Sequence, residues 1–131
     1  MFQVKDVMTD RVVVAGPETT IDEIVSLLLD HQVSGLPVVD DDGLLLGVIT
    51  EIDIISLVYE SYDNTTIVSD YMTRDVLTLD AEASLDDVAS IFCKKTIRRI
   101  PIVREGRLIG IVSRRDLIRF VRDVREEVAT L

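Results

Sequence analysis

The chain has 131 residues, of which 47% are hydrophobic and only 5% aromatic, so one ordinary domain with an aliphatic core is expected. No apolar run approaches the roughly 18 residues of a membrane helix, and the first residues do not form a signal peptide. The net charge of −10 disfavours nucleic acid or an anionic membrane as partner of the whole surface. A single cysteine excludes an internal disulfide and favours a reducing compartment, so we expect a cytoplasmic protein.

The predicted elements begin with a strand, a helix and a hairpin. The β-branched run at residues 12–14 predicts a short strand. Thr20, followed three residues later by Glu23, indicates the start of a helix with an apolar face. The Asp40–Gly43 segment is typical of a hairpin turn. In chain order, we expect a strand at 12–14, a helix at 19–32, strands at 36–39 and 44–49, and a helix at 50–59.

The same order of elements occurs a second time. The start VKDVMTDRVVV is answered by VSDYMTRDVLT, and the match continues through both halves. A unit of about 60 residues has trouble burying enough apolar surface alone, so the copies should pack as one domain about a pseudo-twofold axis. We expect repeat 1 at 1–60, a linker at 61–67 and repeat 2 at 68–131, whose strands are predicted at 76–79, 100–103 and 108–112 and whose helices at 84–95 and 113–124.

Three ordered motifs carry a resemblance to a known family. Each copy has MT near its start, LPVVD or IPIVR in a strand, and GVITEID or GIVSRRD where the second helix begins. Together they resemble a tandem pair of CBS domains, the cystathionine-β-synthase-type repeats often called a Bateman module, from Val4 to about Val121. The resemblance implies an α/β (α+β) fold of two β-α-β-β-α repeats and a regulatory or sensor module rather than an enzyme.

The last motif suggests how such a module would hold a ligand. Thr50 and Ser113 stand where a helix begins, a place that favours a phosphate, and Asp53 and Asp116 follow three residues later. A carboxylate can accept two hydrogen bonds from a ribose diol. The preceding glycines, Gly47 and Gly110, are expected to let a flat ligand approach the strand. In the family, these Ser/Thr and Asp positions contact the phosphate and ribose of adenosine nucleotides.

The resemblance also implies an apolar slot for adenine in each repeat, and a ligand bound in the cleft between the repeats. The ligand could be AMP, ADP or ATP, with NAD or S-adenosylmethionine as further possibilities; no cofactor is required. The expected binding residues of repeat 1 are Met8, Val13, Val33, Ser34, Val48, Thr50 and Asp53. Those of repeat 2 are Met72, Leu77, Ile97, Arg98, Ile111, Ser113, Arg114, Arg115 and Asp116.

Charge separates the two repeats. Of the 14 basic residues, only Lys5, Arg11 and Arg74 precede residue 94, so repeat 2 carries a basic patch. Because arginines pair well with phosphate, the sequence favours repeat 2 as the holder of the nucleotide phosphates. A solvated basic face or a salt-bridge surface explains the same residues without a ligand.

Other interpretations remain open from the sequence. A hydroxyl residue followed three positions later by Asp is close to a capping box, which needs no ligand. The alternative function is a ligand-free module that uses the basic second repeat to bind a protein or nucleic acid. No residues form a catalytic or metal-binding pattern. We expect a homodimer formed through apolar helix faces, and a protein partner that the sequence does not identify.

Overall fold

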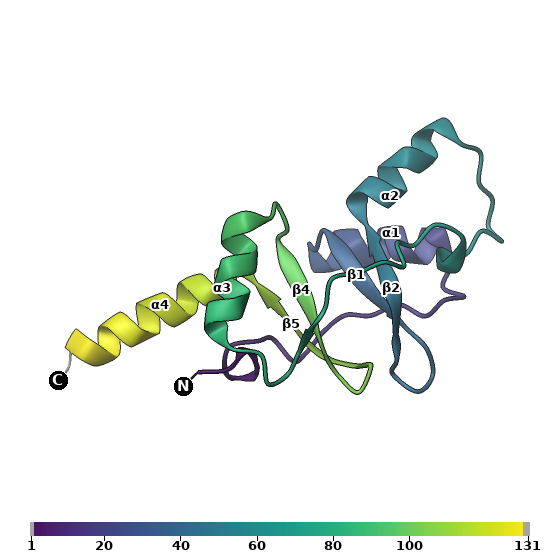
Figure 1. The fold of residues 1–131 in the computed structure, drawn as a ribbon. Coiled ribbons are helices and arrows are strands. Elements are labelled where there is room, and N and C mark those ends of the chain that lie inside the picture. The colour runs from purple at the N-terminus through teal and green to yellow at the C-terminus, as the bar shows by residue number, and fades with distance from the viewer. Residues whose placement is uncertain (1, 130–131) are drawn as a thin grey trace. The chain divides into compact units, whose positions relative to one another are not determined.

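The computed structural model describes residues 2–129, which fold into two compact α/β units (Figure 1). The first-repeat unit contains residues 13–76 and 106–108. The second-repeat unit contains the residues up to 12, residues 77–105 and the residues from 109 onward. Each unit has a core of its own. The α/β class predicted from the order of elements is confirmed.

The first-repeat unit is built around one antiparallel hairpin. Thr20 caps its first helix, since its Oγ1 accepts a hydrogen bond from the Glu23 N–H at 3.2 Å. In the hairpin turn, Asp40 Oδ1 accepts from the Leu44 N–H at 3.0 Å, and Gly43 has a φ of +84° that favours glycine. The elements are α1 (Ile21–His31), β1 (Gly35–Val39), β2 (Leu45–Thr50), α2 (Glu51–Ile55) and the 3₁₀ helices η2 (Ser56–Tyr59) and η3 (Val68–Asp70).

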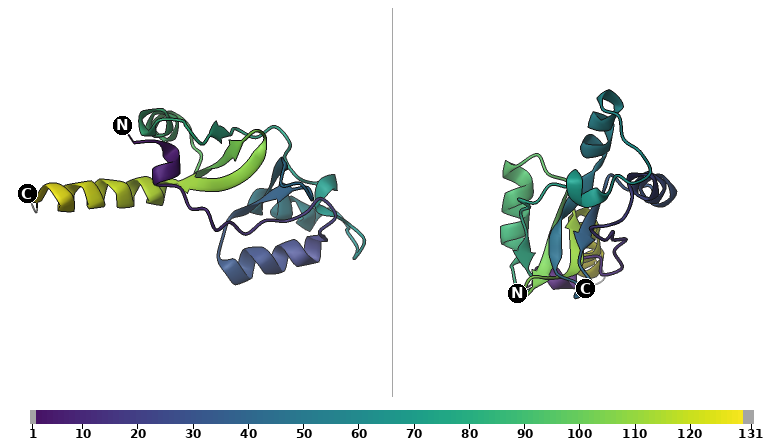
Figure 2. Two further views of the ribbon diagram at one scale, coloured as in Figure 1. Left: turned by 90° about the horizontal axis from the view of Figure 1, so that it is seen from below. Right: turned by 90° about the vertical axis from the view of Figure 1, so that its right-hand side faces the viewer.

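The second-repeat unit places a three-stranded sheet beside two helices. Ser84 caps the first of them by accepting from the Asp87 N–H at 3.1 Å. The strand order is β3-β4-β5, in which β3 runs parallel to β4. Figure 2 shows the last helix, α4, extending outward from the end of β5. The elements are η1 (Val4–Asp6), β3 (Leu79–Asp80), α3 (Leu85–Lys94), β4 (Arg99–Arg104), β5 (Arg107–Ser113) and α4 (Arg114–Ala129), and only the first two residues of β5 belong to the first-repeat unit.

The start segment of each repeat packs into the unit that contains the other repeat. Val4 is completely buried in the second-repeat core, and its N–H donates to Ala83 O at 2.8 Å. Val68, its counterpart, is completely buried in the first-repeat core, and its N–H donates to Thr19 O at 2.8 Å. The compact units therefore do not coincide with the sequence repeats at 1–60 and 68–131.

Four elements differ from the sequence predictions. The strand expected at 76–79 is reduced to the two residues of β3, Leu79–Asp80. The strand expected at 12–14 does not form; only Ala15 pairs with Val38, in an isolated parallel bridge. The helix expected at 50–59 changes from α to 3₁₀ at Ser56, whose Oγ donates back to Asp53 O at 2.7 Å. The last helix continues to Ala129 rather than ending at residue 124, because neither Gly nor Pro follows Gly110 to stop it.

Candidate functional site

Thr50 and Asp53 form a reciprocal pair at the start of α2. The Thr50 N–H and Oγ1–H donate to Asp53 Oδ2 at 2.9 and 3.0 Å. In return, the Asp53 N–H donates to Thr50 Oγ1 at 3.4 Å. This is a capping box, with Asp in the place more often taken by Glu. The motif therefore forms the capping box that its spacing indicates. Oδ1 of Asp53 accepts no hydrogen bond from residues 2–129.

Ser113 and Asp116 form the same pair at the start of α4. The Ser113 N–H donates to Asp116 Oδ2 at 2.8 Å, and the Asp116 N–H donates to Ser113 Oγ at 3.2 Å. Asp116 is only 5% exposed, whereas Asp53 is half-buried. The motif therefore sits at equivalent places in both units but in different surroundings.

Two further side chains contact Asp116. Arg119 Nη1 donates to Asp116 Oδ1 at 2.8 Å in an ion pair, and Thr9 Oγ1 donates to the same oxygen at 3.2 Å. Neither residue was predicted from the sequence as part of the site. Arg119 was detectable, because residues three apart on a helix are neighbours. Thr9 was not, because its place in the second-repeat unit depends on the exchange of start segments.

The glycines before the motif make room for the protein itself. A Cβ on Gly47 would clash with Thr73 O and would lie 3.3 Å from Met72 Sδ. A Cβ on Gly110 would lie 2.6 Å from Met8 Sδ and 2.9 Å from Thr9 O. The expectation that these glycines admit a flat ligand is therefore corrected: the MT segments occupy the space.

Most of the expected residues lie in the unit of their own repeat, but the two methionines are exchanged between the units. Met8 packs against the second-repeat core and Met72 belongs to the first-repeat core, each opposite to its expected group. The first-repeat unit holds the rest of the first group: Val13, Val33, Ser34, Val48, Thr50 and Asp53. The second-repeat unit holds the rest of the second group: Leu77, Ile97, Arg98, Ile111, Ser113, Arg114, Arg115 and Asp116.

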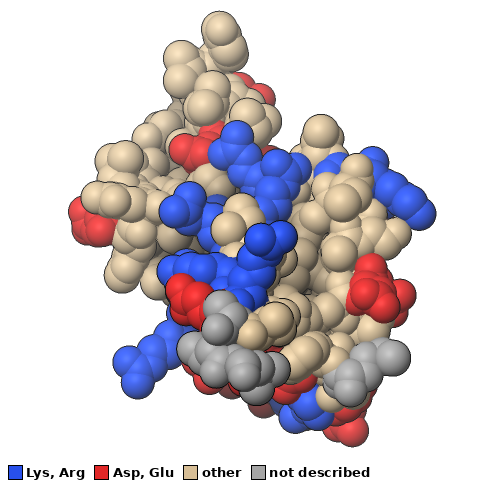
Figure 3. Space-filling model, turned by 90° about the vertical axis from the view of Figure 1, so that its left-hand side faces the viewer, with Lys and Arg blue, Asp and Glu red and all other residues tan. Residues whose placement is uncertain are grey.

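The basic residues of the second group lie at the start of α4 and before β4. The Arg114 N–H donates to Arg98 O at 3.2 Å, and Arg114 Nε donates to Ile97 O at 2.9 Å. These bonds tie the start of α4 to the segment before β4, while Arg98 and Arg115 are exposed. Viewed toward the C-terminal end of α4, Lys and Arg side chains gather on one face (Figure 3). Part of the basic patch is therefore structural and part is open to solvent.

Neither a metal cluster nor a membrane helix is found in the described part of the chain. Residues 2–129 contain no group of three or more His, Cys, Asp or Glu side chains placed to hold a metal ion. None of the helices in these residues is both long and apolar enough to cross a bilayer. The chemical groups of the two Ser/Thr–Asp motifs are hydroxyls, which donate and accept hydrogen bonds, and carboxylates, which accept them.

The chain belongs to the CBS domain family, since the family's sequence profile matches residues 4–60 and 68–123. Protein MJ1225 of Methanocaldococcus jannaschii is 35% identical over 118 residues, which is 90% of this chain and 42% of that protein. The chain thus spans less than half of this longer relative.

Two solved structures of similar chains contain adenosine ligands. CBSX2 from Arabidopsis thaliana, solved in complex with AMP, is 32% identical with a TM-score of 0.86, covering 95% of this chain and 99% of that chain. The CBS domain pair of MJ0100, solved with 5′-methylthioadenosine and S-adenosyl-L-methionine, is 31% identical with a TM-score of 0.78, covering 94% and 98%. This chain is therefore a CBS pair whose structural neighbours bind adenosine-type ligands.

Proposed function

We propose that this CBS pair is a regulatory module that binds an adenosine nucleotide of the AMP, ADP or ATP class. The observation that carries the proposal is the Ser/Thr–Asp pair, which ends a glycine-containing strand in both units. Its hydroxyl and carboxylate match a phosphate and a ribose diol, and two similar CBS pairs hold AMP or S-adenosylmethionine. The ligand is a signal and not a substrate.

The proposed ligand contacts are taken from the residues expected from the sequence and are grouped by the unit in which each residue lies. In the first-repeat unit, the proposed polar contacts are Thr50 and Asp53, and the proposed apolar contacts are Val13, Val33 and Val48. In the second-repeat unit, the corresponding polar groups are Ser113 and Asp116, with apolar Ile97 and Ile111. Apolar side chains beside a few polar groups are typical of small-molecule sites.

A calorimetric titration against AMP, ADP, ATP, NAD and S-adenosylmethionine tests the proposal. We expect at least one of them to bind and to raise the melting temperature, because a ligand that binds only the folded state stabilises it by mass action. If none of these ligands in large excess releases heat or moves the thermal transition, the sensor function is wrong.

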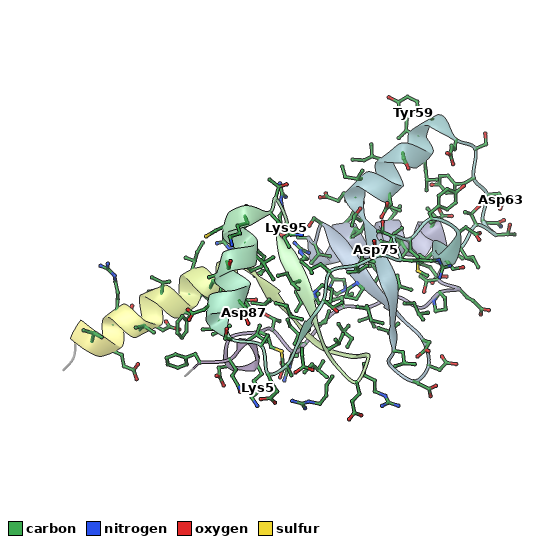
Figure 4. The ribbon with its side chains drawn as sticks, in the orientation of Figure 1. Lys5, Tyr59, Asp63, Asp75, Asp87 and Lys95 are labelled. Atoms are coloured by element: carbon green, nitrogen blue, oxygen red, sulfur yellow. The ribbon has the colours of Figure 1, made fainter. Side chains whose placement is uncertain are left out.

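We also propose that the chain forms a homodimer in the cytoplasm. Ile52, Val58 and Tyr59 on α2 and η2 are 73%, 78% and 91% exposed, and Tyr59 projects from the end of η2 in Figure 4. Exposed apolar side chains gathered on neighbouring turns are typical of an association surface. This surface favours a second copy of the chain as its occupant.

The second candidate function is docking of an acidic partner on α4. Its support is the row of exposed arginines along α4: Arg114, Arg115, Arg119, Arg122 and Arg125. Binding of this kind would weaken steeply as salt rises and would not depend on Asp53. Measuring the affinity for an acidic partner at two salt concentrations distinguishes this docking function from the sensor function.

A further inference from the structure

Asp53 and Asp116 hold equivalent positions but do not offer a ligand the same carboxylate. A carboxylate has two oxygens with about four lone-pair positions in total. At Asp53, both accepted hydrogen bonds come from Thr50 and fall on Oδ2. Oδ1 accepts no hydrogen bond within residues 2–129, and the side chain is half-buried. One whole oxygen of Asp53 therefore remains open.

At Asp116, both oxygens are already engaged. Ser113 uses Oδ2, while Thr9 and Arg119 both use Oδ1, at 3.2 and 2.8 Å. The bond from Arg119 is charge-assisted, which makes it stronger than a bond between neutral groups. Because the Asp116 side chain is only 4% exposed, this pair is also poorly screened by solvent on the carboxylate side.

The difference comes from two side chains, Thr9 in the start segment and Arg119 on the helix, and not from the backbone. Around both motifs the MT segment pairs with the strand in the same way: Thr73 with Val48 at 2.8 and 2.9 Å, and Thr9 with Ile111 at 2.8 Å in both directions. The residue three positions after the aspartate is Ser56 in one unit and Arg119 in the other. Ser56 carries no charge, and its hydroxyl donates to Asp53 O at 2.7 Å instead.

We propose that Asp53 is the carboxylate that accepts the ribose diol, and that Arg119 closes the Asp116 motif to it. The inference rests on the adenosine-ligand function proposed above and makes the two motifs unequal. A diol at Asp116 must first displace a charge-assisted bond, which lowers affinity there by about tenfold or more. From the sequence, the basic residues favour repeat 2 as the stronger site. The assignment reverses that preference, because Arg119 already neutralises the Asp116 carboxylate before any ligand binds.

Calorimetric titration of the full chain with AMP and with 2′,3′-dideoxy-AMP tests the assignment. We expect one AMP site per chain, with binding of the dideoxy analogue weaker by about tenfold or more because it lacks both donors. Asp53→Asn should abolish the preference for AMP over the analogue. Arg119→Ser, which copies Ser56, should create a second AMP site. The matched control is Arg122→Ser, since within residues 2–129 Arg122 pairs only with the exposed Asp123, at 3.2 Å, and the change should leave a single site.

The possible outcomes separate the inference from the function on which it rests. If the unmodified chain binds no AMP, ADP, ATP, NAD or S-adenosylmethionine, both are wrong. If AMP binds but its preference over the analogue survives Asp53→Asn, the assignment to Asp53 is wrong while the sensor function stands. If Arg119→Ser still has one site, Arg119 does not close the second motif. Circular dichroism verifies folding, and Arg119→Gln replaces Arg119→Ser if the latter does not fold.

Discussion

At Gly47 and Gly110 the start segments approach the strands closely. We predict that Gly110→Ala lowers the free energy of unfolding by about 1–3 kcal/mol, because the new Cβ would lie 2.6 Å from Met8 Sδ and 2.9 Å from Thr9 O. Gly47→Ala should act in the same way through Thr73 O. Urea denaturation measures the loss.

Gly16→Ala is the matched control for these substitutions. A Cβ at Gly16 would lie 3.7 Å from its nearest neighbour, an ordinary contact, so the change should stay within about 0.5 kcal/mol. Equal losses in all three variants would show that the close approach of the start segments is not what the two strand glycines provide.

Local signals at single residues could be predicted from the sequence, while their distant partners could not. The Ser/Thr–Asp spacing indicated both caps, and the structure has them at Thr50 and Ser113. The partner of Asp116 in the start segment could not be predicted, because Met8-Thr9 and Met72-Thr73 are chemically the same. Either dipeptide fits beside either glycine, so the sequence does not state which unit each joins.

At the scale of elements, an ion pair holds the start segment to its unit. Lys5 Nζ donates to Glu82 Oε1 at 3.0 Å, and this hydrogen bond, followed by the charge of Lys5, lowers the pKa of Glu82 from its ordinary 4.5. A carboxyl whose pKa is lowered by folding stabilises the protein above the unfolded-state pKa. That contribution is lost as the pH falls through the lowered value.

We predict that Glu82→Gln lowers stability at neutral pH and that the difference from the unmodified chain disappears in acid. Urea midpoints measured from neutral pH to below the ordinary pKa of glutamate give the profile. Glu18→Gln is the control, since Glu18 is the counterpart of Glu82 in the first repeat and forms no ion pair within residues 2–129. A difference that stays constant with pH would contradict the role of the ion pair.

Elements with a strong pattern were predicted well, and those that depend on distant contacts were not. The apolar periodicity of α1 and α3 and the β-branched runs of β1 and β4 place these elements within two residues of their observed bounds. The run at residues 12–14 has the same strand-like composition, but the boundary of the two units falls within it and it does not form a strand. The next residue, Ala15, forms an isolated bridge with Val38. Composition reports what a segment prefers and not whether a neighbouring strand is available.

At the scale of the whole molecule, the bounds of the two compact units predict which fragment of the chain folds better on its own. A fragment of residues 13–76 keeps Val68 and Met72, which are buried in the first-repeat core. A fragment of residues 1–64 has the same length but loses both. We predict that the first fragment shows more helix and a more cooperative thermal transition by circular dichroism. Equal behaviour of the two would mean that the start segment adds little to that core.

The proposed homodimer gives a second prediction at this scale. We expect light scattering at micromolar concentration to give the mass of a dimer, and Val58→Glu to give a monomer, because a charge would be buried against the second copy. Leu29→Glu is the control: Leu29 is 72% exposed, close to the 78% of Val58, but lies on α1. A monomer for the unmodified chain would contradict the proposal.

The burial of Val4 in the second-repeat core also sets an order of events during synthesis. Residues 13–76 leave the ribosome as a nearly complete unit, whereas Val4 must wait for Ala83 and for Val112, with which it shares a core. The start segment is made before residues 13–76 but finds its place after them, in contrast to the usual folding of domains from the N-terminus onward. Until the strand that ends at Ser113 emerges, Val4 and Met8 remain uncovered apolar side chains, exposed to chaperones and proteases on every nascent chain.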